Sequence, residues 1–135
     1  MSVLEGASFL TRKPQTVTDA ELAVLRILWQ RGALTAREIT SALYPRGAES
    51  EFASVHSYLQ RLERKGLVQR DRSSFVHSFS ATVSQADVVG EELRTLAARL
   101  GERSIAPLIM QLVEGKRLSE KEAAEIRKLL DDYSK

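Results

Sequence analysis

The 135-residue chain contains no cysteine, which excludes disulfide bonds and thiolate metal sites. It also has no apolar run that approaches the length of a membrane span. Residues 1–15 lack the charged start and the apolar stretch of a signal peptide. We therefore expect a soluble, cytoplasmic protein with no metal site and no contact with a membrane.

The features of common enzyme sites are missing as well. The chain has no cysteine nucleophile, no glycine-rich phosphate loop and no paired metal-ligand histidines, since His56 and His77 fall on unlike predicted elements. Most carboxylates occupy helix caps or exposed helix faces. We expect neither catalysis nor a cofactor.

Charge of one sign is also scarce, because 20 basic residues face 18 acidic ones and the formal net charge is +2. Binding to nucleic acid would have to come from placed charges and not from bulk attraction. One local excess exists between residues 61 and 72, where only Glu63 and Asp71 are acidic. The basic residues of this segment are Arg61, Arg64, Lys65, Arg70 and Arg72.

With 43% hydrophobic residues, the chain can form one domain, or one small domain with an appendage. Residues 1–16 show no periodicity and are predicted to be a flexible arm. Capping boxes at Thr18–Glu21 and Thr35–Glu38 predict the starts of two helices. The first should end near Gly32 and the second at the Pro45-Arg46-Gly47 turn, and a third helix is expected over residues 49–65.

After Gly66 the helical period gives way to alternation. Residues 67–72 are predicted to form one strand and residues 75–80 another, joined by a tight turn at Ser73-Ser74. Three helices followed by a hairpin is the order of a winged helix-turn-helix, with the hairpin as its wing. The expected class is mainly α (α+β), with this domain over residues 17–82. Trp29 and Phe79 are predicted core residues, and His77 is expected to be a packed strand histidine.

The third predicted helix has two unlike faces. At about 100° of rotation per residue, one apolar side is shared by Val55, Tyr58, Leu59 and Leu62. The opposite side has no large hydrophobe and no acid, as a helix that enters a DNA major groove requires. An ordinary surface helix is the alternative, although it would usually carry more Glu and Lys. The residues on this side are Ala53, His56, Ser57, Gln60 and Arg64.

Basic residues near this helix are candidates for contacts with DNA phosphates, which fix the position of a protein on the duplex. A solvated basic rim is the alternative interpretation. The candidates are Arg37, Arg61, Arg64, Lys65, Arg70 and Arg72.

Helical periodicity returns over residues 83–135. Gly101 and Gly115 separate three predicted helices, Pro107 fits the first turn of the second, and a capping box at Ser119–Glu122 opens the third. Such short stripes need a partner surface, either within the chain or on another chain. We favour dimerisation, because isologous dimers are the commonest oligomers. The interface candidates are Leu96, Leu100, Leu108, Leu112, Ile126, Leu129 and Leu130.

Taken in order, these features resemble the penicillinase and methicillin-resistance repressor family (the BlaI/MecI type, which includes the copper repressor CopY). The resemblance covers about residues 17–133, through segments such as Thr18–Leu22, Arg61–Val68 and Leu118–Glu122. It implies a transcriptional repressor that binds as a homodimer to a palindromic double-stranded DNA operator of resistance or stress genes. The base-reading positions of the family fall on Ala53, Ser54, His56 and Ser57.

Two departures from the family bear on induction. Copper-responsive members carry a cysteine cluster, so the absence of cysteine excludes a thiolate switch here. Members induced by beta-lactams are cleaved at an Asn-Phe bond. The matching segment of this chain, Arg99-Leu100-Gly101, lacks that bond, which argues against cleavage at this place by the same kind of protease. A sensor-protease that cleaves elsewhere, an unknown inducer, or no induction remain as alternatives. The alternative to a repressor is a winged-helix protein-interaction module in a larger assembly.

Overall fold

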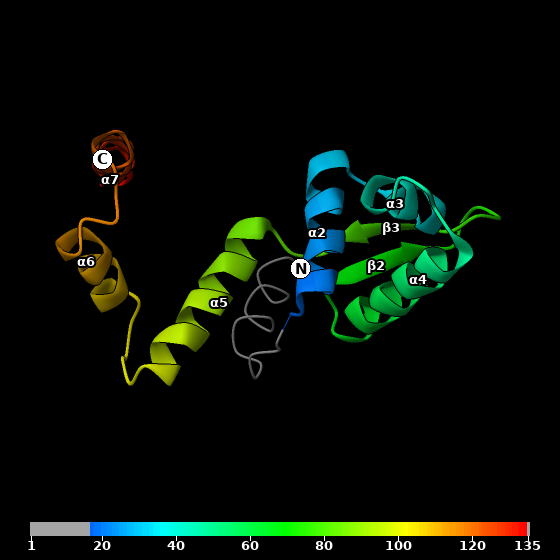
Figure 1. The fold of residues 1–135 in the computed structure, drawn as a ribbon, viewed down its shortest axis with the longest axis horizontal. Helices are drawn as coiled ribbons and strands as arrows, with labels where there is room; N and C mark the ends of the chain where they lie inside the picture. Colours follow the sequence, from blue (N-terminus) through cyan, green and yellow to red (C-terminus); the bar gives the residue numbers. More distant parts are fainter. Residues whose placement is uncertain (1–16, 135) are drawn as a thin grey trace. The chain divides into compact units, whose positions relative to one another are not determined.

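The computed structural model describes residues 17–134, which form helices and three short strands (Figure 1). The chain divides into two compact units, the first ending at Glu91 and the second beginning at Glu92. The first unit therefore continues past residue 82, and the predicted arm at 1–16 lies outside the described residues. The elements are α2 (Asp19–Arg31), β1 (Leu34–Thr35), α3 (Ala36–Leu43), α4 (Glu49–Arg64), β2 (Val68–Asp71), β3 (Ser78–Ala81), α5 (Gln85–Arg99), α6 (Ala106–Glu114) and α7 (Glu120–Tyr133). Between residues 17 and 134, no helix is both long and apolar enough to cross a membrane.

The predicted capping boxes are confirmed at the first two helices. At α2, the Thr18 side chain accepts from the backbone N–H of Glu21 at 3.2 Å. At α3, Thr35 and Glu38 make the same reciprocal pair. The glycine that follows α2, Gly32, has a φ of 83°, which an L side chain rarely adopts. Short-range signals thus fix the bounds of these helices.

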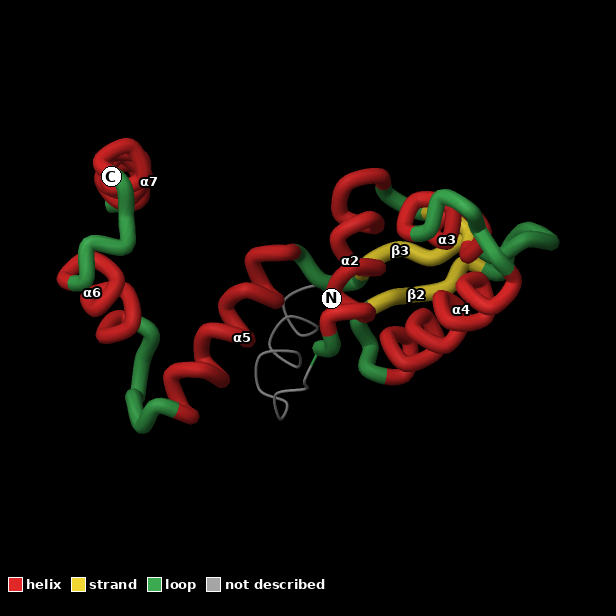
Figure 2. The backbone as a smooth tube through the Cα atoms, viewed as in Figure 1, coloured by secondary structure: helices red, strands yellow, loops and turns green. Residues whose placement is uncertain are grey.

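The sheet has three antiparallel strands in the order β1-β3-β2, where the sequence predicts only a hairpin. The two longer strands, β2 and β3, lie side by side in Figure 2. In β1, Leu34 pairs with Phe79 of β3, and Arg70 of β2 pairs with Phe79 from the other side. Two residues cannot display an alternating pattern, so β1 leaves no signal of period two in the sequence.

The predicted tight turn at Ser73-Ser74 is wrong. β2 ends at Asp71 and β3 begins at Ser78, so residues 72–77 form a wing loop that projects beyond both strands (Figure 2). Asp71 starts this loop by accepting from the backbone N–H of Ser73 at 2.9 Å. A hydrogen bond from the Ser73 side chain, together with this backbone bond, lowers the pKa of Asp71.

The core of the first unit lies between its helices and one face of the sheet. α2 provides Val24, Leu25 and Leu28, while Phe79, 2% exposed, comes from β3. The indole Nε1 of Trp29 donates to the carbonyl of Val83 at 2.9 Å, which ties α2 to the segment after β3. Phe79 is confirmed as a core residue, and Trp29 packs against the core while partly buried. The other buried members of the cluster are Ala36, Ile39, Val55, Leu59, Leu62, Leu67 and Val68.

The second unit has the predicted helices but little interior. Pro107 lies in the first turn of α6, and Ser119 caps α7 by accepting from the backbone N–H of Glu122 at 3.0 Å. At the end of α6, Lys116 has the positive φ of 55°, whereas Gly115 does not. Within the described chain, neither α6 nor α7 contributes a buried residue.

Candidate nucleic-acid interface

The two predicted faces of α4 are present in the structure. Val55, Leu59 and Leu62 are fully buried against the core. Ala53 and Gln60 are exposed, while Ser54, His56 and Ser57 are half-buried. The base-reading candidates therefore follow one accessible side of α4. Their role in reading DNA stays a prediction.

Neighbouring groups fix several of these side chains. Ser54 Oγ donates to the Ser50 carbonyl at 3.0 Å. The His56 ring meets the Phe52 ring edge to face, with 4.8 Å between the ring centroids. Gln60 has no recorded hydrogen bond to any residue between 17 and 134, so its amide is available for a partner. Because its donor and acceptor lie side by side, a free amide suits an adenine edge.

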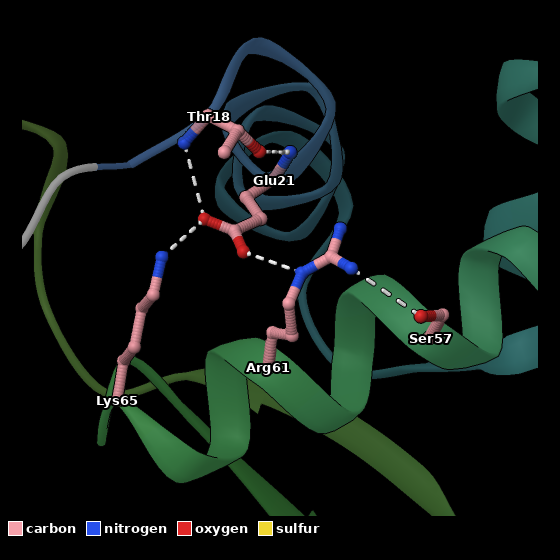
Figure 3. A network of polar contacts seen from close by, with 5 residues as sticks. All are labelled: Thr18, Glu21, Ser57, Arg61 and Lys65. Carbon is pink, nitrogen blue, oxygen red and sulfur yellow. Dashed lines mark hydrogen bonds and ion pairs between the residues drawn. The ribbon is translucent and has the colours of Figure 1, made fainter.

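A buried carboxylate joins α2 to α4 beside this surface (Figure 3). Glu21 is 0% exposed and accepts from Arg61 Nε at 3.0 Å, Lys65 Nζ at 2.7 Å and the backbone N–H of Thr18 at 3.1 Å. Arg61 Nη1 also donates to Ser57 Oγ at 3.4 Å. The network thus runs from the start of α2 to a predicted base-reading residue of α4.

The charge on Glu21 survives its burial. Burial raises the pKa of this carboxyl, but the hydrogen bonds from Lys65, Thr18 and Arg61 together lower the pKa by more than burial raises it. The net effect places the pKa of Glu21 below its ordinary value of 4.5, so the group is ionised at neutral pH. A charged acceptor is what holds the two cations in place.

The expected excess of positive charge between residues 61 and 72 is smaller than the sequence indicates. Arg61 and Lys65 are engaged by Glu21, which lies 40 and 44 residues earlier in the chain. The expectation that only Glu63 and Asp71 oppose this segment is therefore wrong. Contact of Arg61 and Lys65 with phosphate stays a prediction. Each of these two side chains would have to bind DNA while paired with Glu21, or leave Glu21 to do so.

Three more of the candidates, Arg37, Arg70 and Arg72, also face acids. Glu63 lies 3.3 Å from Arg70 and 3.4 Å from Arg72, while Arg37 lies 3.1 Å from Glu49. The side chains of Arg72 and Arg37 are 60% and 58% exposed, and such exposed ion pairs contribute little to the stability of the fold. Their binding to DNA phosphates in place of these carboxylates stays a prediction.

Arg70 is more enclosed than the other candidates. Its side chain is 19% exposed, its guanidinium lies 4.8 Å from the centre of the Phe79 ring, and its Nε has no hydrogen-bond partner in the described chain. Arg64 is the opposite case, because it is exposed and has no recorded partner between residues 17 and 134.

The chain with this surface also matches a family of known proteins. The family model described as Penicillinase repressor matches residues 17–132. The chain belongs to the penicillinase repressor family. The match covers the winged helix and nearly all of the C-terminal helices, and it confirms the resemblance inferred from the sequence.

Members of this family from several bacteria are similar over almost their whole length. The penicillinase repressor of Staphylococcus aureus is 23% identical over 126 residues, which cover 93% of this chain and 99% of the relative. The methicillin resistance regulatory protein MecI of Mammaliicoccus sciuri is 20% identical over 122 residues, 90% of this chain and 98% of the relative. Among solved structures, a MarR family protein from Bacillus stearothermophilus is 24% identical, with a TM-score of 0.45, over 98% of this chain and 85% of that one.

In this family member, a cavity of about 200 Å³ opens between the start of α3, α4 and the wing loop. His56 of α4 and His77 both line it. The prediction that His77 is a packed strand histidine is wrong, because this residue lies half-buried in the loop just before β3. The cavity places the wing loop beside the N-terminal half of α4. Its other lining residues are Thr35, Ala36, Arg37, Phe52, Arg70, Phe75, Val76 and Phe79.

Other ionisable groups add little to the chemistry of the surface. Burial raises the pKa of Tyr44 at the end of α3, and the neighbouring Tyr58 and Glu51 raise it further, so this phenol is neutral. Within residues 17–134, no group of three or more His, Cys, Asp or Glu could hold a metal ion. The surface can offer hydrogen bonds and cations to a large anionic partner.

Sequence reasoning recognised Glu21 as a helix cap and missed its second role. A signal was present, because Glu21, Leu25 and Leu28 have the i, i+4, i+7 spacing of one helix face. An acid in line with a buried apolar stripe must find cationic partners.

Proposed function

We propose that this chain is a sequence-specific, DNA-binding transcriptional repressor that acts as a homodimer on a palindromic operator of resistance or stress genes. The observation that carries the proposal is the family match, which continues from the winged helix through the C-terminal helices. Both halves of the chain therefore correspond to a repressor, and not only its DNA-binding fold.

The surface of α4 supports contact with a DNA major groove. Its accessible side carries short or hydrogen-bonding side chains, among them Ala53, Ser57 and Gln60. A rigid core holds the opposite side of the helix, so the donors are presented in a fixed arrangement. Arg37, Arg64, Arg70 and Arg72 flank this side as candidates for phosphate contacts, and Arg61 and Lys65 would join them only as members of the Glu21 network.

The second unit supports the homodimer. Large apolar side chains of α6 and α7 are exposed in the single chain, with Val113 at 57% and Leu129 at 67%. A soluble protein rarely leaves such a surface uncovered. A second copy would bury the same patch on both chains and present two α4 helices to half-sites about one helical turn, ~34 Å, apart. Of the predicted interface residues, Leu96, Leu100, Leu112, Ile126, Leu129 and Leu130 are exposed and Leu108 is half-buried.

Footprinting on the DNA upstream of the gene that encodes the chain tests this function. We expect a protected palindrome whose binding constant falls steeply with salt, with a log–log slope of about −0.9 for each phosphate contacted. A scrambled duplex of equal length and composition is the control for sequence specificity. No protection at low salt would contradict the proposal and favour the protein-interaction module.

A further inference from the structure

We propose that Phe75, at the tip of the wing loop, is an apolar DNA contact that enters the minor groove beside the major-groove site of α4. This inference rests on the proposed function. It adds a contact at a position that base-reading and phosphate-binding candidates do not include.

The exposure of Phe75 is the first observation. Its side chain is 101% exposed, and the neighbouring Val76 is 59% exposed. The other phenylalanines of the described chain are covered, since Phe79 is buried and Phe52 is half-buried. Burying a phenylalanine is worth about 1.5–3 kcal/mol, so the folded chain leaves this stabilisation unused.

The position of the wing loop is the second observation. Phe75 and Val76 line the same 200 Å³ cavity as Phe52 and His56 of α4 and Arg37 of α3. The tip therefore lies on the side of the unit that holds the N-terminal half of α4. A duplex with α4 in its major groove would meet the wing at the adjacent backbone and minor groove.

The surroundings of the tip favour DNA over a protein as its partner. From residue 72 to residue 86 the chain contains no acidic residue. Arg72 stands at the start of the loop, and Arg37 and Arg70 line the cavity beside it. Glu49 and Glu63 pair with these arginines in the free chain, and the phosphates of a polyanion would compete with those carboxylates for them.

The size of the apolar tip leads to the same partner. Two side chains are far less than the buried area that a stable protein interface requires. A single phenylalanine is, however, the kind of apolar wedge that minor-groove proteins insert at a base step.

The test compares Phe75→Ala with the wild-type chain and with Arg72→Ala on the operator defined by footprinting. We expect Phe75→Ala to weaken binding about tenfold while the salt slope stays unchanged, because no phosphate contact is lost. Arg72→Ala, the matched wing control, should make the slope shallower by about 0.9. The fluorescence of the single tryptophan, Trp29, reports whether each variant is folded.

Groove-specific footprints complete the experiment. Hydroxyl radicals attack deoxyribose from the minor groove, so Phe75→Ala should lose protection there while guanine N7 stays protected in the major groove. Wild-type affinity with an unchanged footprint would overturn the role of Phe75 and leave the repressor function standing. A changed sedimentation coefficient with unchanged DNA affinity would assign Phe75 to a chain–chain contact instead. Failure of the wild-type chain to bind any upstream DNA would overturn both proposals.

Discussion

Glu21 combines a local and a long-range role in one carboxylate. It closes the capping box of α2 and also accepts from Arg61 and Lys65 of α4. Removing one member of such a group leaves the remaining charges without partners, so the loss of stability exceeds the net contribution of the ion pair. The geometry of α4 relative to α2 thus depends on a side chain that no DNA would touch.

We predict that Glu21→Gln lowers the free energy of unfolding by about 2 kcal/mol, the scale of a hydrogen bond to a charged group. The amide oxygen can still accept from the Thr18 backbone, but the charge that holds the cations is gone. Urea denaturation followed by Trp29 fluorescence measures the change. Glu38→Gln is the matched control, because Glu38 fills the same cap position at α3 and is exposed. Equal losses in both variants would show that only the cap matters.

The lowered pKa of Glu21 gives its contribution a defined dependence on pH. A carboxyl whose pKa is lower in the folded state stabilises the fold fully above its unfolded value, ordinarily 4.5. The contribution declines as the pH falls below that value and is lost once the pH passes through the folded pKa. We predict that the stability difference between wild type and Glu21→Gln is constant near neutral pH and shrinks below about pH 4.5. Parallel curves down to the acid transition would contradict this origin.

Arg64 is the arginine of α4 whose charge is not already engaged within the described chain. We predict that Arg64→Ala makes the salt slope of operator binding shallower by about 0.9, because one phosphate contact is lost. Arg26→Ala on α2 is the control, since Arg26 is likewise exposed. Titrations at four or more salt concentrations measure both slopes. A slope that is unaltered by Arg64→Ala would place this residue outside the phosphate contacts.

At the scale of the element, α4 has to be apolar on the side that faces the core and to carry short or hydrogen-bonding side chains on the side that would face DNA. Ser57 is a poor site for an added charge, because its hydroxyl accepts from Arg61 and a carboxylate there would compete with Glu21 for that guanidinium. Gln60 avoids this problem, since it is exposed and has no recorded partner within residues 17–134.

We predict that Gln60→Glu weakens operator binding by tenfold or more, because an acid would replace a donor at the base edges and face phosphates, a loss of at least ~1.4 kcal/mol. The shape of the side chain is nearly unchanged, so thermal stability should be too. Gln30→Glu on α2 adds the same charge at another exposed helical position. Equal weakening by both variants would mean a general charge effect, and no weakening would remove Gln60 from the interface.

The elements differ in how far sequence can predict them, and the range of the interaction explains why. Caps are contacts between residues three apart, so the starts at Thr18, Thr35 and Ser119 can be read from short motifs. β1 exists through its pairing with β3, some 44 residues later, and it is too short for any pattern. The pairing of Arg61 with Glu21 has the same long-range origin. The balance of charges within residues 61–72 alone therefore overestimates the positive charge available near α4.

At the scale of the whole molecule, the two units satisfy their apolar residues differently. The first has a closed core drawn from three helices and a sheet. In the second, Ala97 of α5 is buried, whereas α6 and α7 expose apolar side chains along the described chain. In the proposed homodimer a second copy covers these side chains, and the family match, which extends through both helices, supports that proposal. If that proposal holds, the link between this surface and the DNA-binding unit makes operator affinity depend on association.

Leu129 of α7 tests this dependence with little risk to the fold, because it is 67% exposed and gives up little packing within the chain. We predict that Leu129→Asp sediments as a monomer and binds the operator about 100-fold more weakly, since the two half-sites are no longer engaged by linked copies. Lys128→Asp introduces the same side chain one position earlier, about 100° around the helix, and should stay dimeric. Retained helicity by circular dichroism and unchanged Trp29 fluorescence would show that the monomer is folded. If Leu129→Asp remains a dimer, this face of α7 is not the interface; if it is monomeric with full operator affinity, association does not govern DNA binding.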